Sequence, residues 1–146
     1  MKQKIEKLND NERAWLADQL KNVAKFVEAY SPEDSENSLN LAALDRAFAA
    51  FLATGQSDIG LVNTIISSVG IAFGQLLVEG LGLEWVIATD EQGSDLAVYG
   101  LPGKGDVLIY PANFVAKRWE RREKNFLKRS YDLIASQVRD ISKAQR

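Results

Sequence analysis

Four carboxylates lie close together in the segment LEWVIATDEQGSDLAVYG, residues 83–100: Glu84, Asp90, Glu91 and Asp95. Paired carboxylates can act as general acid and base or hold a hard cation, so this segment is the first candidate for a chemical site. The surrounding pattern, however, predicts two strands joined by a type I turn, with Asp at its first and Gly at its fourth position. In such a hairpin Asp90 accepts a hydrogen bond from a turn N–H. We therefore interpret these carboxylates as turn and surface residues rather than as a metal or acid–base site.

The second candidate is the basic segment KRWERREKNFLKR, residues 117–129, which carries seven cations and two acids. On one continuous helix, one stripe opposite the apolar residues carries Lys117, Arg121, Lys124 and Lys128. This pattern is typical of a solvated helix face, but it also suits an anionic ligand or an acidic partner. Arg118 and Arg122 border the apolar stripe, so they could pair with acids of the hairpin or of the earlier helices.

The composition excludes several kinds of chemistry. The 146 residues include no cysteine and no histidine, which excludes disulfides, thiolate nucleophiles, Ser-His-Asp triads and the commonest transition-metal ligand. A net charge of −2 argues against a dedicated nucleic-acid-binding protein. We therefore expect no metal, no cofactor and no nucleic acid.

Helical periodicity predicts two helices at the start of the chain. The first begins at Asp10 and keeps apolar residues at helical spacing as far as Tyr30. An acidic loop that contains Pro32 ends it, and the second helix runs from about Asn40 to Thr54. Both helices have one apolar face, so we expect them to pack on a common core.

A third helix is predicted over residues 60–78, a segment without any charged residue that contains Gly70 and Gly74 as a GxxxG pair. Its length and this motif would suit a membrane span. Polar residues are spread along it, however, and no Lys/Arg cluster flanks it. We predict a central buried helix, with no membrane, whose glycines let another element approach closely.

The second half of the chain predicts a three-stranded antiparallel meander followed by a long C-terminal helix that packs on the sheet. The ranges are Leu83–Thr89, Asp95–Gly100 and Asp106–Tyr110 for the strands and Pro111 to about Ser142 for the helix. With a bulge at Gly93, the first two strands pair so that Trp85 faces Tyr99.

One domain over residues 1–146 is predicted, because the chain has no internal repeat and no linker able to separate two domains. Residues 1–58 form a helical part, and residues 59–146 add the central helix, the meander and the long helix. Helices, then a meander, then a helix correspond to an α+β fold.

Part of this pattern resembles a known family. The similar features are Gly70-x-x-x-Gly74, then Gly82-Leu83-x-Trp85, the Asp90 to Gly93 turn, Pro111, and Val115-x-Lys117-Arg118. Over roughly Asn63 to Leu127 they resemble a bacterial domain-of-unknown-function family, the one catalogued as thirty-eight-oh-six. The resemblance implies a bacterial origin and one compact domain, but no activity, substrate or site residues.

Two functions follow from these observations. The first is a cytoplasmic protein that binds another protein without catalysis, such as an immunity or antitoxin-like inhibitor. The residues that would bind the partner are Asp90, Glu91, Asp95, Lys117, Arg118, Arg121 and Lys124. The alternative is a small-molecule-binding protein or an enzyme that uses a cleft between the sheet and the C-terminal helix. Trp85, Tyr99 and Tyr110 are the possible lining of that cleft.

Overall fold

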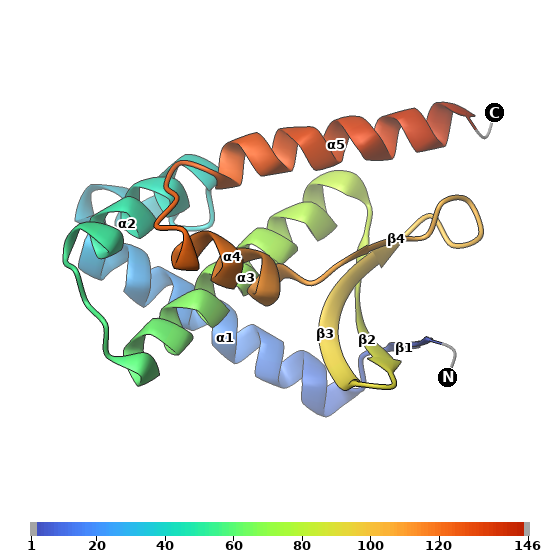
Figure 1. The fold of residues 1–146 in the computed structure, drawn as a ribbon, viewed down its shortest axis with the longest axis horizontal. Coiled ribbons are helices and arrows are strands. Elements are labelled where there is room, and N and C mark those ends of the chain that lie inside the picture. The colour runs from blue at the N-terminus through green and yellow to red at the C-terminus, as the bar shows by residue number, and fades with distance from the viewer. Residues whose placement is uncertain (1–2, 145–146) are drawn as a thin grey trace.

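The structure is a computed structural model that describes residues 3–144. Helices make up most of it, and one small sheet lies at one end of the molecule (Figure 1). The mixture of helices with an antiparallel sheet confirms the predicted α+β class. In chain order the elements are β1 (Lys4–Lys7), α1 (Asp10–Tyr30), the 3-10 helix η1 (Pro32–Asn37), α2 (Leu41–Ala53), α3 (Ile59–Leu81), β2 (Glu84–Asp90), β3 (Gly93–Gly100), β4 (Val107–Ile109), α4 (Pro111–Glu120) and α5 (Leu127–Ala144).

The sheet has four antiparallel strands in the order β1-β2-β3-β4. The predicted three-stranded meander is present as β2-β3-β4, and the sheet has one strand more than predicted. The additional strand, β1, pairs with β2 from Lys4 opposite Thr89 to Lys7 opposite Val86. Ile5 is its only apolar residue, and the three charged residues around it leave no alternating pattern to recognise. The unpaired edge of β2, rather than the sequence of β1 itself, accounts for this strand.

The β2–β3 hairpin pairs Asp90 with Gly93, one residue tighter than predicted. Asp90 accepts a hydrogen bond from the backbone N–H of Gln92 (2.8 Å), as turn chemistry predicts. Gly93 continues the ladder instead of standing outside it as a bulge, so Trp85 does not face Tyr99. Because a shift of one residue moves a side chain to the other face of a sheet, Trp85 and Tyr99 lie on opposite faces.

α3 is the central helix, and α1, α2, α4 and α5 all pack against it. It is long and apolar enough to span a membrane, yet 56% of its apolar window is buried inside the protein, as expected for a core helix. A Cβ on Gly70 would lie 2.8 Å from the Cα of Ala112 in α4, and one on Gly74 would overlap the Trp85 ring. The two glycines therefore let α4 and β2 contact the backbone of α3 directly.

The C-terminal helix predicted from Pro111 to Ser142 is two helices, α4 and α5, joined by a turn. Two residues with positive φ interrupt it, Arg122 at 54° and Asn125 at 59°. The backbone N–H of Arg122 donates to the carbonyl of Trp119, and the backbone N–H of Glu123 donates to the carbonyl of Arg118. These two hydrogen bonds form a Schellman motif, which ends α4. The apolar periodicity continues across this break, which is why the sequence predicts one helix. α4 packs on α3, whereas α5 crosses α2 and α3 and reaches over β4 (Figure 1).

Candidate functional site

Four exposed cations gather where α4 ends and the turn to α5 begins. We call them the basic turn: Lys117, Arg121, Arg122 and Lys124. None of them forms an ion pair with any residue in the described range, whereas the other three cations of this segment are paired. The guanidinium of Arg122 lies 4.0 Å from the centroid of the Trp119 ring, which orients this side chain. The turn therefore presents positive charge that the fold itself does not neutralise.

A buried aromatic residue anchors the basic turn to the core. Phe126 follows the turn and is buried, with its ring edge-on to Phe48 of α2 at 5.4 Å between centroids. Its ring also meets Phe114 of α4 at 6.0 Å. Burying a phenylalanine side chain contributes roughly 1.5–3 kcal/mol, so the connection between α4 and α5 is fixed rather than loose.

Asp45 of α2 supplies a second anchor, which sequence analysis did not identify. Its carboxylate is only 7% exposed and accepts hydrogen bonds from the backbone N–H groups of Leu127 (2.9 Å) and Lys128 (3.1 Å). The first N–H groups of a helix lack partners within the helix, and the helix dipole favours an anion there. Asp45 therefore caps α5 from a different helix. The signal that could have revealed it is an acid beside Leu44 on the apolar face of α2.

Arg118, which the sequence placed among the partner-binding residues, is half-buried and packed within the turn. Its guanidinium lies 3.9 Å from the centroid of the Phe114 ring, and that ring stacks on Phe73. Its Nε lies 3.8 Å from a carboxylate oxygen of Glu123, which also accepts a hydrogen bond from Arg129 (3.2 Å). Arg118 of α4 thus pairs with Glu123, in the turn that follows α4, and not with an acid of the hairpin.

Most acids of the helical half are used within the fold. Glu12 takes part in the cap of α1, Asp58 caps α3, and Asp45 caps α5. Asp34 accepts two hydrogen bonds from Arg46 (2.6 and 2.9 Å). These bonds, with one from a serine hydroxyl, lower the pKa of Asp34 to about 2. In the helical half most acids thus have partners within the fold, whereas the four cations of the basic turn pair with no described acid.

A second candidate site is a pocket of about 370 Å³ between the β2–β3 turn and the start of α4, which we call the hairpin pocket. Two of the hairpin carboxylates border it. Its polar lining comes from Asp90, Gln92, Asp95, Tyr110 and Asn113. Glu91 lies outside this lining. The Tyr110 hydroxyl also accepts a hydrogen bond from the side chain of Gln3 (2.9 Å). Within residues 3–144 no group of three or more histidine, cysteine or acidic side chains could hold a metal ion.

Trp85 and Tyr99, the other two residues predicted to line a cleft, lie apart. Trp85 packs on α3, and its indole N–H donates to the side-chain oxygen of Gln75 (2.9 Å). Tyr99 donates its hydroxyl proton to Asp106 (2.9 Å), which raises the pKa of Tyr99. A hydrogen bond from the Gly103 backbone, and then that of Tyr99, lower the pKa of Asp106. The two aromatic residues belong to opposite faces of the sheet and do not share a cleft.

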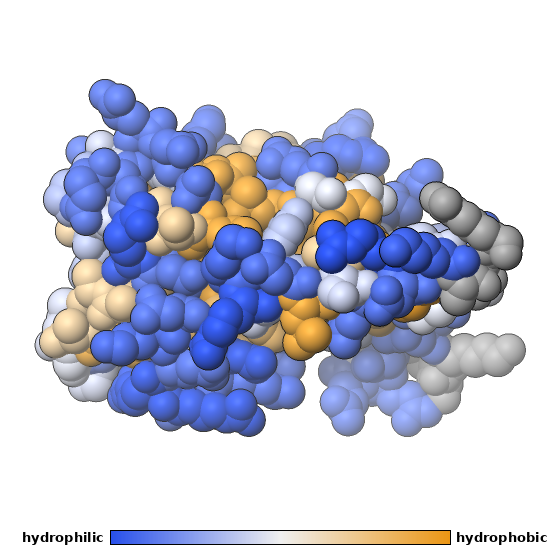
Figure 2. Space-filling view, turned by 90° about the horizontal axis from the view of Figure 1, so that it is seen from above, coloured by the Kyte–Doolittle hydropathy of each residue, from blue (hydrophilic) through white to orange (hydrophobic). Residues whose placement is uncertain are grey.

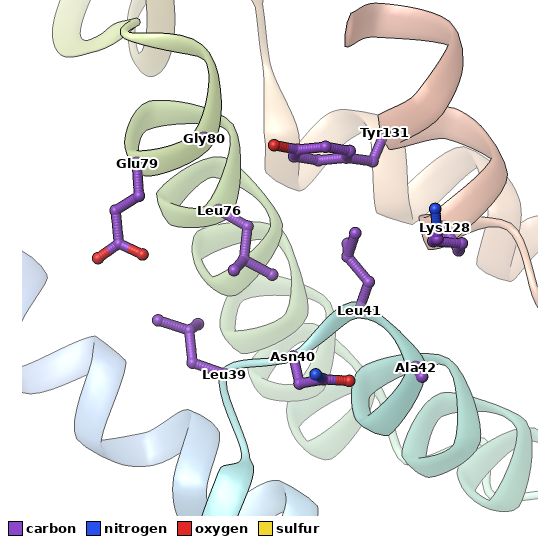
Figure 3. Close-up of a pocket in the computed structure, with 9 residues that line it drawn as sticks. All are labelled: Leu39, Asn40, Leu41, Ala42, Leu76, Glu79, Gly80, Lys128 and Tyr131. Atoms are coloured by element: carbon purple, nitrogen blue, oxygen red, sulfur yellow. The ribbon is translucent and has the colours of Figure 1, made fainter.

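Two apolar grooves flank α5, and Figure 2, which looks onto the face that α5 covers, shows apolar side chains between the polar ones. The first groove, about 500 Å³, lies where the start of α2, the end of α3 and the start of α5 meet. Leu39, Leu41 and Leu76 line this groove, and in the close-up they lie below Tyr131 (Figure 3). The second groove, about 510 Å³, lies between β4 and the C-terminal half of α5.

The amino-acid sequence matches one known domain family over the part of the chain that holds the basic turn. The family described as Domain of unknown function (DUF3806) matches residues 56–131, just over half of the chain. The chain belongs to this family. The resemblance inferred over Asn63 to Leu127 is thereby confirmed, and the DUF3806 region contains both the basic turn and the hairpin pocket. β1, α1 and α2, with Asp45, lie outside it. No curated protein and no solved structure matches the chain.

Proposed function

We propose that this DUF3806 protein acts by binding another protein rather than by catalysis, and that the basic turn meets an acidic surface of that partner. The observation that carries the proposal is the set of four exposed cations without a carboxylate partner in residues 3–144. Phe126 and Asp45 anchor the turn that presents them, and an anchored surface loses little conformational freedom on binding. Opposed charges also speed association and reject wrong partners.

The specific form that we propose is an immunity or antitoxin-like inhibitor in the cytoplasm. Such an inhibitor blocks its target by covering a functional surface, so it needs a specific interface and no catalytic side chains. The sequence, which contains no histidine and no cysteine, is compatible with that role. A target enzyme that binds metal ions or nucleic acid can still have an acidic surface, namely its metal-binding carboxylates. We propose that the basic turn covers an acidic surface of this kind.

The test reverses charge at the basic turn and at a matched set of positions. The test variant changes three residues to glutamate: Lys117, Arg121 and Lys124. The control variant changes three other exposed lysines, in β1 and α1, to glutamate: Lys7, Lys21 and Lys25. Wild type and both variants, tagged, are used to capture partners from a lysate of the native host, and the partner found is purified for titration.

We expect the test variant to bind the purified partner at least about tenfold more weakly and the control variant to bind within about twofold, because charge pairs at an interface are specific. Binding that falls equally in both variants would reflect net charge alone and would contradict the proposal. A labelled DNA duplex is titrated in parallel, and tight binding of DNA with no protein partner would also contradict it.

A second candidate function, a small-molecule-binding protein or an enzyme, is favoured by one observation. The hairpin pocket places the carboxylates of Asp90 and Asp95 beside Tyr110 around about 370 Å³, within the roughly 300–1,000 Å³ of known ligand sites. A ligand that binds only the native state raises the melting temperature. A panel of amines, nucleosides and divalent metals that raises it in wild type but not in Asp95→Asn would support this function. No shift across the panel would count against it.

A further inference from the structure

We propose that the groove between β4 and α5 binds an extended peptide segment of another protein, which adds a fifth strand to the sheet beside β4. The groove lies on a different part of the surface from the basic turn, so this inference holds or fails independently of the proposed function. Strand addition of this kind uses main-chain hydrogen bonds for affinity and side-chain pockets for specificity.

The first wall of the groove is a free sheet edge. β4 is the last strand in the sheet order and pairs only with β3. Half of the backbone N–H and C=O groups of an edge strand point away from its neighbour. In the part of the chain that the structure describes, no hydrogen bond reaches the outer edge of Val107–Ile109. The edge therefore offers unsatisfied donors and acceptors next to an apolar groove.

The second wall is one face of α5. Ile134, Val138 and Ile141 recur at helical spacing and line the groove opposite β4. The far end of α5 comes down on the β3–β4 loop, where a Cβ on Gly105 would lie 3.0 Å from a methyl carbon of Ile141. α5 thus forms the wall opposite β4, and its contact with the β3–β4 loop marks one end of the groove.

The dimensions of the two walls agree with a short extended segment. Three residues of β4 extend over about 10 Å at roughly 3.3 Å per residue. The seven steps from Ile134 to Ile141 also rise about 10 Å along α5 at roughly 1.5 Å per residue. The groove volume, about 510 Å³, lies in the range of established ligand sites. We infer that three residues of the incoming strand make the contact.

The lining determines which side chains the peptide carries. Every side chain that lines the groove is apolar except those of Gln137 and Asp140, both in α5 and both exposed. Asp140 forms no ion pair with the described residues and carries the groove's one charge. Successive side chains of a strand point to opposite sides. The complementary segment therefore has apolar residues at alternate positions and a lysine or arginine placed to meet Asp140.

The experiment selects peptides of about seven random residues, displayed on phage, against the full chain. The best peptide, labelled with fluorescein, is then the probe for titration and for backbone hydrogen exchange. We expect alternating apolar residues, at least one lysine or arginine, and slowed exchange in Val107–Ile109 when the peptide binds. Two substitutions with the same change in charge are compared. Asp140→Lys weakens binding at least about tenfold, whereas Glu28→Lys, an exposed position on α1, leaves it within about twofold.

Methylation of the peptide backbone separates strand addition from other modes of binding. Successive N–H groups of a strand point in opposite directions, so N-methylation at one central residue removes a bond to β4 and N-methylation at its neighbour does not. We expect at least about a tenfold loss for one and less than about twofold for the other.

Four results would overturn the proposal. They are a selection that yields no binder, protection from exchange outside β4 and α5, equal loss from both methylations, and self-association of the chain that Asp140→Lys abolishes.

Discussion

Replacement of Asp45 by alanine should destabilise the protein far more than replacement of an exposed acid by alanine, because it removes both hydrogen-bond acceptors at the start of α5. The carboxylate accepts hydrogen bonds from Leu127 and Lys128, and Leu127 is completely buried. After the change, the N–H of Leu127 would remain in the interior without an acceptor. The anion that the dipole of α5 favours would also be gone.

The size of the effect follows from these two bonds. A capping side chain contributes about 0.5–2 kcal/mol, and a hydrogen bond to a charged group contributes about 1.5–3 kcal/mol. We therefore expect Asp45→Ala to lower the free energy of unfolding by about 2–4 kcal/mol. At roughly 2–4 °C per kcal/mol for a chain of this size, the melting temperature falls by about 4–16 °C. Asp45→Asn keeps one acceptor but turns an amide N–H₂ toward the second donor, so about half of that loss is expected.

Urea unfolding followed by circular dichroism measures these differences directly. Asp132→Ala is the matched control, because Asp132 is an exposed acid of α5 that pairs with Lys128. An exposed pair of this kind contributes about 0.3–0.5 kcal/mol. Hydrogen exchange adds a local readout, since the first turn of α5 should open more readily in Asp45→Ala. A loss below about 0.5 kcal/mol in Asp45→Ala, or a loss no larger than that of the control, would refute the account of the cap.

Two further predictions concern pH and packing. Hydrogen bonds from Arg46 and a serine hydroxyl lower the pKa of Asp34 from 3.8 to about 2, so Asp34 stabilises the fold above about pH 4 and loses this contribution as the pH falls to about 2. Melting curves of wild type and Asp34→Asn should therefore differ at about pH 6, and most of this difference should be lost at about pH 2. A difference at about pH 2 as large as that at about pH 6 would contradict this. Gly70→Ala forces α4 away from α3 and should cost about 1–3 kcal/mol. Gly60→Ala, where a Cβ would lie in ordinary contact 3.4 Å from Asp58 Oδ1, should stabilise by up to about 1 kcal/mol in the same unfolding assay. Equal effects of the two alanines would contradict the close approach.

Local chemistry made several features of the fold predictable. Asp90 and Gly93 define a turn through side-chain bonding and backbone freedom, and both act at the predicted turn. Pro111 lacks an N–H and has a fixed φ, so it begins α4 as expected. Gly70 was expected to permit a close approach, and α4 makes that approach. Asp90, Gly93 and Pro111 act within a few positions of themselves in the sequence, whereas Gly70 shows only that something can approach and not that Ala112 of α4 does so.

The features that could not be predicted depend on partners far away in the sequence. β1 is a strand only because β2 offers it an edge, more than seventy residues along the chain. The break between α4 and α5 is set by backbone hydrogen bonds around Arg122 and by the burial of Phe126, and neither interrupts the apolar periodicity. Asp45 finds its donors 82 residues away. The candidate site shares this limit, because sequence identifies the cations of the basic turn but not which of them remain unpaired.

The central claim, that the basic turn binds a partner protein, is tested most directly by one titration. The partner captured from the native host is titrated with wild type and with the variant that has Lys117, Arg121 and Lys124 changed to glutamate. The account predicts that the dissociation constant of the variant is at least about tenfold higher while its melting temperature stays close to that of wild type. An unchanged dissociation constant in a folded variant would contradict it.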